Sequence, residues 1–490
     1  MNLHQLLLSA FPLLEEEILK QKNFLVKGLT DNSKEACENY IFVCLKGYRV
    51  DGHDFVDQAL KNGAAFFVSQ KALPPEYPHL VISDTRLALA KLAAIFYDYP
   101  TTKFQLIGVT GTNGKTTTTF LVDKILRDQG LKTGLVGTMF AKVVNEKYNV
   151  ENTTPNALYL QQLFAEMVEK NVEVAVMEVS SHALDEGRVL GCDYDITIFT
   201  NLTQDHIDYH ETMINYKHSK SLLFSQLGSK ITKDHSKFAV LNLDDETSKY
   251  YSKITSAHIV TYSIHQKADF MAKDIELSSN GTIFTLHYPK GKILIVSPFI
   301  GLFNVYNCLA AIAAAYCYGV SMDDIVRSIS NAPSISGRFE TVQAGQNFTV
   351  IVDYAHTPDS LENVLKTILQ FAKNNVYCIV GCGGNRDKTK RPKMAKIACE
   401  YATHPIFTSD NPRMEDPKQI LLDMEEGAIG SNYIVIEDRR EAISYAISNA
   451  TAGDIILIAG KGHETYQLVK NEVLHFDDKE EALIAIKNKQ

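Results

Sequence analysis

The sequence contains no pair of cysteines at the C-x-x-C spacing, although it has eight cysteines among its 490 residues. A zinc ribbon or a disulfide framework needs cysteines at short, regular spacings. Several of the cysteines instead interrupt apolar runs, as Cys308 and Cys378 do. We therefore interpret them as small buried hydrophobic residues of a protein in a reducing compartment.

The sequence also has no excess of positive charge. Its 49 lysines and arginines are outnumbered by 58 aspartates and glutamates, which gives a formal net charge of −9. Proteins that bind nucleic acids attract phosphates with clustered positive charge. We therefore expect no nucleic-acid partner.

No apolar run is long enough to cross a bilayer, which takes about 20 consecutive apolar residues. The longest such run lies around Cys308–Tyr318. The first residues, MNLHQLLLSAF, have neither the basic segment nor the small-residue cleavage site of a signal peptide. We therefore expect a cytoplasmic protein without membrane insertion.

The length of the chain predicts three domains, since a domain usually contains about 150 residues. In residues 1–102 short β runs alternate with helical patterns until Pro100-Thr101-Thr102 interrupts them. Residues 103–335 have the pattern of a mononucleotide-binding unit, and a second break lies at Pro333–Arg338. In residues 336–490 strand and helix patterns alternate, which predicts a doubly wound, mainly parallel sheet. The predicted fold class is α/β throughout.

The stretch LIGVTGTNGKTTTTF, residues 106–120, has the pattern of a phosphate-binding loop (P-loop). An apolar strand pattern leads into the turn Gly111-Thr112-Asn113-Gly114, and Lys115-Thr116-Thr117 opens an amphipathic helix. Backbone N–H groups of such a turn, together with the helix N-terminus, bind phosphate oxygens. We expect Lys115 to reach the β- and γ-phosphates, and Thr116 or Thr117 to hold Mg²⁺. Val109 replaces the first glycine of the general pattern, but the strand–helix context predicts an ATP or GTP site.

Two polar residues are candidates for positions beside this loop. Glu178 lies near the end of an apolar stretch, Val172–Val179, that resembles a central parallel strand, and α/β sheets bind ligands at that end. Glu178 is interpreted as a metal ligand, and the alternative is an acid that caps the next helix. His206 follows the next strand and is a candidate contact to Mg²⁺ or phosphate. A zinc pair of His206 and His210 has no evident third ligand.

Lys220 lies on the apolar face of a predicted helix. Tyr216, Lys220, Leu223, Phe224 and Leu227 fall at the spacing of one helical face. If this lysine is desolvated, it tends to lose its proton, and the neutral amine can react with CO₂. Alternatively, its ammonium group reaches the solvent at the edge of the apolar stripe. The pattern alone favours neither interpretation.

Four polar clusters follow predicted strands of the C-terminal region. They are Asp353–His356, Gly383–Lys388, Asp410–Arg413 and Gly460–Glu464. Parallel strands bring their carboxyl ends to one edge of a sheet, so these clusters should meet there. Their mixture of arginines and acids suits a zwitterionic ligand such as an amino acid.

Taken together, these and neighbouring segments resemble the motifs of the Mur ligases, which build the stem peptide of peptidoglycan precursors. The segments are TGTNGKTT, NTTP, MEVSSHAL, FTNLTQDHIDYH, SGRFE, DYAHTPDSL, GCGGNRDKTKRP, DNPR and GKGHE. The resemblance runs from about Leu29 to Glu464 and points to the type that adds the third stem residue. It implies a small N-terminal α/β domain for the UDP end of the substrate. A central ATPase domain and a C-terminal Rossmann-like domain would follow.

The resemblance also implies roles for individual residues. ATP would contact residues 111–117 and also Asn304, Asn307 and Arg338. The UDP-muramoyl peptide would contact Ser33, Asn152, Thr153, Thr154, Ser180 and Arg188. The catalytic residues would be Lys115, Lys220 and His206. Mg²⁺ would be held by Thr116, Glu178, His206 and a carbamate formed on Lys220. Lys34 replaces the arginine of the family's aspartate-serine-arginine turn, and Glu186 stands where glutamine is common.

In the C-terminal domain the resemblance implies a site for meso-diaminopimelate. Its residues would be Arg386, Asp410, Asn411, Pro412, Arg413, Gly460 and Glu464. The DNPR motif of the family, which separates diaminopimelate-adding from lysine-adding enzymes, is intact at residues 410–413. Diaminopimelate differs from lysine by one carboxylate, and an arginine binds a carboxylate through two parallel hydrogen bonds.

The expected activity is therefore an ATP-dependent ligation in cytoplasmic peptidoglycan precursor synthesis. Meso-diaminopimelate would be joined to UDP-MurNAc-L-Ala-D-Glu through an acyl phosphate, with ATP and Mg²⁺ required, by a monomeric enzyme. One alternative is a ligase similar to folylpolyglutamate synthase, although the N-terminal region and DNPR argue against it. A second alternative is a P-loop switch without ligase chemistry.

Overall fold

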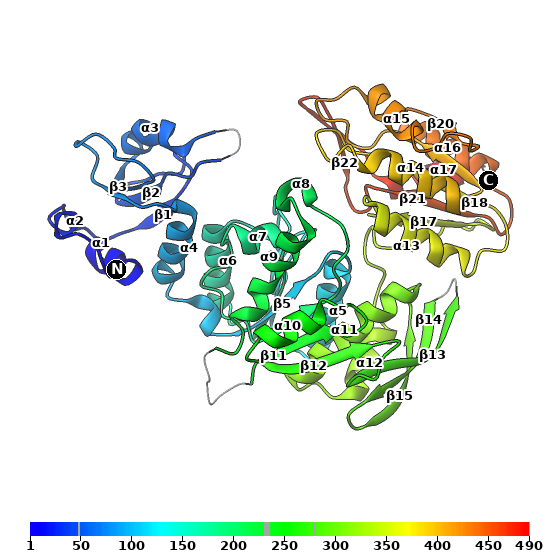
Figure 1. Cartoon of the computed structure of the whole chain (residues 1–490), viewed down its shortest axis with the longest axis horizontal. Coiled ribbons are helices and arrows are strands. Elements are labelled where there is room, and N and C mark those ends of the chain that lie inside the picture. The colour runs from blue at the N-terminus through cyan, green and yellow to red at the C-terminus, as the bar shows by residue number, and fades with distance from the viewer. Residues whose placement is uncertain (48–49, 230–235, 279–280, 490) are drawn as a thin grey trace.

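The N-terminal lobe is built on a small parallel sheet. The structure is a computed structural model and describes residues 1–47, 50–229, 236–278 and 281–489. In Figure 1 this lobe is blue, and it is joined through α4 to a central lobe. Its strand order is β1-β2-β3-β4. Its elements are α1 (Leu3–Ala10), α2 (Glu16–Leu19), β1 (Gly28–Thr30), β2 (Tyr40–Val43), η1 (Gly52–Phe55), α3 (Val56–Lys61), β3 (Ala64–Ser69), β4 (His79–Val81), α4 (Thr85–Phe96) and η2 (Pro100–Thr102).

The first residues of the chain form a buried helix that the sequence analysis did not predict. The Asn2 side chain accepts a hydrogen bond from the Gln5 backbone N–H and so caps α1. Leu3, Leu6 and Leu7 of this helix are fully buried in the core that α4 also covers. The apolar residues of this segment therefore stabilise the N-terminal lobe.

The central lobe contains a long sheet with the order β15-β14-β13-β12-β11-β10-β5-β9-β6-β7-β8. The strands from β13 to β6 in this order are parallel, and β14, β15, β7 and β8 extend the two edges in antiparallel pairing. Its strands are β5 (Gln105–Thr110), β6 (Thr133–Val136), β7 (Ala141–Val143), β8 (Glu146–Tyr148), β9 (Val174–Glu178), β10 (Ile196–Phe199), β11 (Phe238–Asn242), β12 (His258–Ser263), β13 (Phe270–Ser278), β14 (Gly281–Tyr288) and β15 (Gly291–Ser297).

Helices cover both faces of this sheet. One core contains residues of α5, α11 and α12, and the other contains residues of α6, α7, α9 and α10. Burial on both faces explains why β9 is apolar at almost every position, as predicted. The helices are α5 (Lys115–Asp128), α6 (Ala157–Glu169), α7 (Ser181–Asp185), α8 (Ile207–His210), α9 (Met213–Ser225), α10 (Ser248–Ile254), α11 (Leu302–Tyr318) and α12 (Met322–Ser330).

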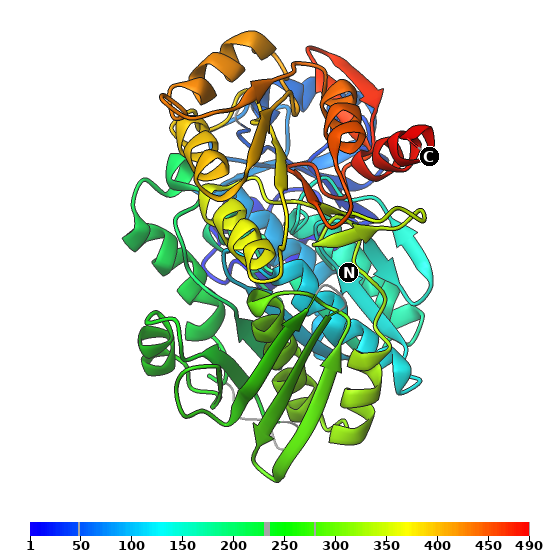
Figure 2. The same cartoon turned by 90° about the vertical axis from the view of Figure 1, so that its right-hand side faces the viewer.

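The C-terminal lobe is a doubly wound sheet with the order β16-β17-β21-β18-β19-β20, in which only the edge strand β16 is antiparallel among the described strands. Helices α13, α14 and α15 cover one face, and α16 and α17 cover the other. In Figure 2 this lobe lies above the central one. Its elements are β16 (Glu340–Val342), β17 (Thr349–Asp353), α13 (Pro358–Leu369), β18 (Val376–Val380), α14 (Lys390–Tyr401), β19 (His404–Phe407), α15 (Pro417–Glu425), β20 (Ile434–Val435), α16 (Arg439–Asn449), β21 (Ile455–Ala459), β22 (Tyr466–Val469), β23 (Glu472–His475) and α17 (Asp478–Lys489).

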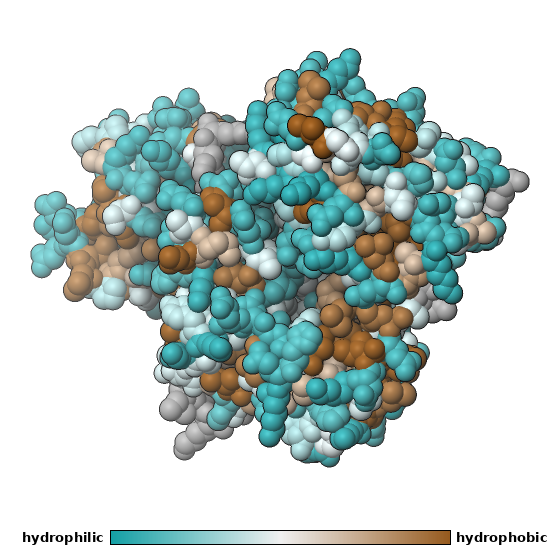
Figure 3. Space-filling view, turned by 45° about the vertical axis from the view of Figure 1, so that its right-hand side comes forward, coloured by the Kyte–Doolittle hydropathy of each residue, from teal (hydrophilic) through white to brown (hydrophobic). Residues whose placement is uncertain are grey.

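The predicted α/β class is confirmed. The three large sheets lie within residues 28–81, 105–297 and 340–459. The domain boundaries near residues 102 and 335 stay predictions. Hydrophobic residues are scattered among hydrophilic ones on the face shown in Figure 3. Among the described residues, no helix has the length and apolar character needed to span a membrane.

Candidate functional site

The P-loop follows β5 and is held by the segment after β10. The Thr112 backbone N–H donates to Asn201 O (2.8 Å), and the Asn113 backbone N–H donates to Asn201 Oδ1 (2.9 Å). Gly111 needs its missing side chain, because a Cβ there would lie 1.8 Å from Thr200 Oγ1. The phosphate loop therefore has a fixed shape before any ligand binds.

Lys115 and Lys220 converge on one carbonyl group of this loop. Lys115 Nζ donates to Gly111 O (2.9 Å) and Thr112 O (2.8 Å), and Lys220 Nζ donates to Gly111 O (2.8 Å). Lys220 is 1% exposed, so the structure selects the inward orientation over the solvent-exposed one. Burial lowers the pKa of the Lys220 ammonium group well below its usual range, and the nearby Lys115 lowers it further. A neutral, reactive amine is therefore favoured at Lys220.

Glu178 lies at the end of β9, beside the first turn of α5. It is 2% exposed, and its Oε2 accepts hydrogen bonds from Thr116 Oγ1 and Thr138 Oγ1, each at 3.0 Å. Its Oε1 accepts from the Thr138 backbone N–H (2.9 Å). A carboxylate and a hydroxyl group beside a P-loop fit Mg²⁺, which prefers oxygen ligands and takes one or two carboxylates besides phosphates.

The histidines near this site do not form a zinc site. His210 Nε2 is 2.9 Å from Ser181 Oγ, so His210 is hydrogen-bonded within the protein. His206 has a left-handed backbone (φ 55°) at the start of α8, and its Nε2 lies 3.3 Å from Asp205 Oδ2. Within the described ranges, no group of three His, Cys, Asp or Glu side chains is arranged to hold a metal.

The segment 152–154 connects Glu178 with the residues predicted to bind the muramoyl peptide. Thr153 Oγ1 lies 3.1 Å from Thr138 Oγ1, and Thr154 Oγ1 donates to Glu178 O (2.9 Å). Arg188 Nη1 donates to Thr154 O (2.9 Å). The Ser180 backbone N–H donates to Thr154 Oγ1 (3.0 Å). Thr153, Thr154, Ser180 and Arg188 are therefore brought together beside the phosphate loop.

Glu186, which the sequence analysis left without a role, is the ionic partner of Arg188. The Arg188 Nη2 atom lies 2.7 Å from Glu186 Oε2, and Arg188 Nε donates to the same oxygen (2.8 Å). Both side chains are largely buried. Glu186 therefore fixes the orientation of the Arg188 guanidinium group.

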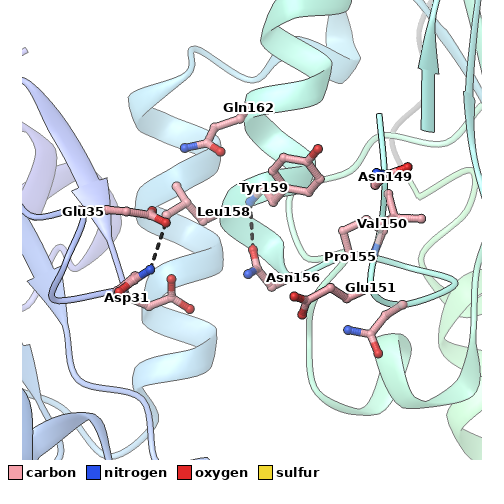
Figure 4. Close-up of a pocket in the computed structure, with 12 residues that line it drawn as sticks. Asp31, Glu35, Asn149, Val150, Glu151, Pro155, Asn156, Leu158, Tyr159 and Gln162 are labelled. Carbon is pink, nitrogen blue, oxygen red and sulfur yellow. Dashed lines mark hydrogen bonds between the residues drawn. The ribbon is translucent and has the colours of Figure 1, made fainter. Parts of the chain in front are cut away.

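A cavity of about 420 Å³ lies between the N-terminal and central lobes. Figure 4 shows Asp31 and Glu35 on one side, and Glu151, Asn156 and Tyr159 on the other. Among the predicted substrate residues, Asn152 lines this cavity. Ser33 does not; its side chain donates to Gln58 Oε1 (2.8 Å), and the cavity is lined instead by its neighbour Asn32.

The polar clusters of the C-terminal lobe meet at one edge of the sheet, as the strand pattern predicted. Asn411 Nδ2 donates to Glu464 Oε2 (2.8 Å), and the buried Lys461 Nζ donates to Asn411 Oδ1 (3.1 Å). A Cβ at Gly460 would lie 2.7 Å from Asp410 Oδ2, so this glycine allows the two loops to touch. Pro412 is also buried at this edge.

The two arginines at this edge lie beside the same glycine, because a Cβ at Gly383 would lie 2.7 Å from Arg413 Nη1 and 3.9 Å from Arg386 Cγ. Burial lowers the pKa of the Arg413 guanidinium group, and the charge of Arg386 lowers it further. Arg413 Nη1 donates to Gly384 O (3.0 Å), and the Arg386 side chain is exposed. An anionic group bound between them would relieve this repulsion.

The central and C-terminal lobes touch at the P-loop. Arg338 Nη2 donates to Thr116 Oγ1 (3.0 Å), and the Arg338 guanidinium lies 4.7 Å from the centre of the Tyr354 ring. Asp359, at the start of α13, accepts from Asn113 Nδ2 (2.7 Å) and Thr203 Oγ1 (3.0 Å). The C-terminal lobe therefore contacts the phosphate loop through Arg338 and Asp359.

The other two predicted nucleotide contacts support the P-loop from α11. Asn307 Nδ2 donates to Asn304 Oδ1 (2.9 Å), and Asn304 Nδ2 donates to Ile300 O (2.9 Å). Both side chains are buried, and Asn307 Oδ1 would lie 2.3 Å from a Cβ at Gly114. Thr117 is also buried, in the first turn of α5.

Sequence reasoning missed Thr138, Asp359 and the Arg188 partner Glu186. Thr138 follows β6, the neighbour of β9, so its position after a parallel strand was a usable signal. Asp359 lies in the motif DYAHTPDSL, but its partner Asn113 is 246 residues away in the sequence. No local pattern indicates a contact of that kind.

Models of known protein families match three segments of the chain. The model described as Mur ligase family, catalytic domain, matches residues 25–97. The Mur ligase middle domain matches residues 109–315, and the model described as Mur ligase, glutamate ligase domain, matches residues 337–462.

Individual relatives extend this similarity over the full length. The UDP-N-acetylmuramoyl-L-alanyl-D-glutamate–2,6-diaminopimelate ligase of Bacillus cereus is 54% identical over 488 residues, which cover 99% of this chain and 98% of that protein. A solved structure of a ligase with the same name has a TM-score of 0.68 and 34% identity, and covers 97% of this chain and 98% of that one. A folylpolyglutamate synthase of Mycobacterium tuberculosis has a TM-score of 0.63 at 16% identity, covers 76% of this chain and 92% of its own, and shares the fold. This chain belongs to the Mur ligase family.

Proposed function

We propose that this protein is an ATP-dependent ligase that joins meso-diaminopimelate to UDP-MurNAc-L-Ala-D-Glu. The observation that carries the proposal is that one edge of the C-terminal sheet holds Arg386 and Arg413 beside Gly383, with Glu464 bonded to Asn411, in the lobe whose Asp359 contacts the P-loop. Diaminopimelate has an additional carboxylate that the guanidinium groups would bind and an ammonium group that Glu464 would bind. The sequence identity of 54% to the Bacillus cereus ligase, which extends over 99% of this chain, supports the same substrates.

The proposed reaction has two steps. The γ-carboxylate of D-Glu attacks the γ-phosphorus of ATP, a P–O bond breaks, and an acyl phosphate and ADP form. The amine of diaminopimelate then attacks the acyl carbon, a C–N bond forms, and phosphate leaves while the amine loses a proton. Both steps depend mainly on positioning the reactants, so no side chain has to form a covalent bond to the substrate.

The chain's own residues would bind and orient the reactants. Lys115 donates hydrogen bonds to two P-loop carbonyl oxygens at 2.8–2.9 Å, and it would donate to the phosphates instead when ATP binds. Arg338 would supply a second positive charge from the C-terminal lobe. Arg188, held by Glu186, would bind a carboxylate of the muramoyl peptide. Mg²⁺, bound near Thr116, Glu178, His206 and a carbamate on Lys220, would neutralise phosphate charge.

ATP hydrolysis assays test this function against both alternatives. Phosphate release should require the UDP-muramoyl dipeptide and diaminopimelate together, and L-lysine should replace diaminopimelate poorly. The variant Lys115→Ala should release no phosphate under any condition. A folylpolyglutamate synthase would instead need a folate and glutamate. Hydrolysis that needs neither co-substrate would identify a P-loop switch and overturn the proposal.

A further inference from the structure

The two loops that carry Arg386 and Arg413 are hydrogen-bonded to each other. The Gly384 backbone N–H donates to Asn411 O (2.9 Å), and the Met414 backbone N–H donates to Asn385 Oδ1 (3.0 Å). A Cβ at Gly384 would lie 1.9 Å from Pro412 O, which shows how closely the two backbones approach. The separation of the two arginines therefore depends on how the loops are joined.

Arg391 of helix α14 connects these two loops through Glu415. It lies in the first turn of α14, and its side chain is 0% exposed. Its Nη2 donates to both carboxylate oxygens of Glu415 (3.1 and 3.0 Å), and its Nη1 donates to Asp423 Oδ2 (2.6 Å). Glu415 belongs to the Arg413 loop, and it also accepts a hydrogen bond from the Asn385 backbone N–H of the Arg386 loop.

This buried charge is not explained by stability alone. Burying a guanidinium group costs free energy that even good ion pairing only roughly recovers, so an apolar residue would stabilise the fold about as well. The pairing does, however, fix geometry, because the planar guanidinium group donates to Glu415 through Nη2 and to Asp423 through Nη1. Arg386 and Arg413 carry like charges beside Gly383, and without such a connection their repulsion would favour separation of the loops.

We propose that Arg391 and Glu415 are positioning residues for amino-acid selection. They hold Arg386 and Arg413 at the separation at which both guanidinium groups reach one distal carboxylate. Neither residue needs to touch the substrate. The inference rests on the proposed function, since it assumes that this edge binds diaminopimelate.

The variant Glu415→Gln tests the inference, because it keeps the shape of the side chain and removes its charge. We expect kcat/KM for diaminopimelate to fall about 10- to 100-fold, mainly through KM. KM for ATP and kcat/KM for L-lysine should change less than twofold. Arg391→Lys should give an intermediate loss, because an ammonium group keeps the charge but cannot donate to Glu415 and Asp423 from two nitrogens held in one plane. Glu481→Gln, which breaks the ion pair between Arg440 and Glu481 in the same lobe, is the control and should have no effect.

A second measurement does not depend on the substrate. In the enzyme without substrates, amide hydrogen exchange in residues 383–388 should be faster in Glu415→Gln than in the wild type or in Glu481→Gln. Unchanged exchange would overturn the positioning role even if diaminopimelate is the substrate. Faster exchange in Glu415→Gln, combined with a wild-type enzyme that does not use diaminopimelate, would overturn the proposed function but leave the positioning of the two loops by Arg391 and Glu415 established. An equal loss for diaminopimelate and L-lysine would reduce Arg391 and Glu415 to general structural residues.

Discussion

Two lysine side chains at the P-loop, Lys115 and Lys220, share one acceptor, Gly111 O. Two ammonium groups this close, one of them fully buried, destabilise each other's charged form. The group with the stronger reason to be neutral is Lys220, whose pKa is lowered by burial and by Lys115. A neutral amine that adds CO₂ would become an anion and would turn this repulsion into attraction.

The first prediction is that Lys220→Ala lowers kcat about 100-fold or more, the usual cost of removing a group that stabilises charge in the reaction. Short carboxylic acids such as acetate should partly restore activity by occupying the position of the carbamate. Lys217→Ala on the same helix serves as the control, since Lys217 lies over the Tyr250 ring. Full activity of the alanine variant would refute the role.

The second prediction concerns Arg413. Losing a charged hydrogen bond at a buried site costs roughly 2–4 kcal/mol, or about 30- to 1000-fold. Arg413→Ala should lower kcat/KM for diaminopimelate by that factor and change kcat/KM for L-lysine little. Measuring both amino acids on both proteins cancels general damage to the fold. Equal losses would mean that selectivity comes from Arg386 or another residue.

At the scale of elements, helix α5 has a glycine with a left-handed backbone at each end. Gly114 (φ 83°) precedes it and Gly130 (φ 81°) follows it. Any other residue in this conformation costs about 1–2 kcal/mol. The surroundings differ, because a Cβ at Gly114 would lie 2.3 Å from Asn307 Oδ1, whereas a Cβ at Gly130 has no heavy atom within 4 Å.

The third prediction uses this pair as a matched comparison. Gly114→Ala and Gly130→Ala should lower the free energy of unfolding by a similar backbone term, about 1–2 kcal/mol. Gly114→Ala should in addition displace Asn307 and raise KM for ATP at least tenfold. Denaturation curves and ATP kinetics check the two parts. Normal ATP kinetics in Gly114→Ala would show that the close approach of the P-loop to α11 is not needed.

At the scale of the whole molecule, Asp359 ties the C-terminal lobe to the P-loop. The fourth prediction is that Asp359→Ala loosens this contact, because Asn113 and Thr203 lose their acceptor. The radius of gyration from X-ray scattering should increase, and the connection around residues 331–337 should be cleaved faster by protease. Glu362→Ala on the same helix is the control, because it removes an ion pair to Lys366 and a hydrogen bond from Tyr401, both within the C-terminal lobe. An unchanged radius would mean that other contacts hold the lobes.

The fifth prediction concerns acid. Burial lowers the pKa values of His182, His356 and His463 to about 4. A histidine whose folded pKa lies below its unfolded value of about 6.5 stabilises the fold above pH 6.5, and this contribution is lost as the pH falls towards 4. Asp353 has the opposite effect, because burial raises its pKa to about 6. Its carboxyl group is therefore protonated below pH 6 in the folded state but not in the unfolded state, which favours the fold on acidification.

Burial also lowers the pKa values of His206 and His210, so the histidines with lowered pKa values outnumber Asp353 and the fold should lose stability between pH 6.5 and 5. Calorimetric melting temperatures measured from pH 7 to pH 5 should therefore fall. His182→Gln should flatten the curve, since this variant has no imidazole to protonate on unfolding. A melting temperature that rises on acidification would contradict the assignment.

Features that depend on neighbouring residues could be predicted from the sequence. The P-loop between β5 and α5, the burial of β9 on both faces and the meeting of four polar clusters at one sheet edge all follow from local patterns. Such patterns suffice because backbone geometry and the parallel order of strands dictate where these groups lie. The helix α1 was missed because a short apolar segment carries too little periodicity.

Contacts between residues far apart in the sequence became visible in the folded protein alone. The inward orientation of Lys220 depends on the hydrogen bond to Gly111 O, and Gly111 lies 109 positions away in the sequence. The hydrogen bonds from Asn113 to Asp359 and from Arg391 to Glu415 form because helices α13 and α14 pack where they do. A charged side chain such as that of Lys220 or Arg391 is compatible with its own helix whether it points inward or outward. Its direction is decided by the free energy of burying it against partners that local sequence does not specify.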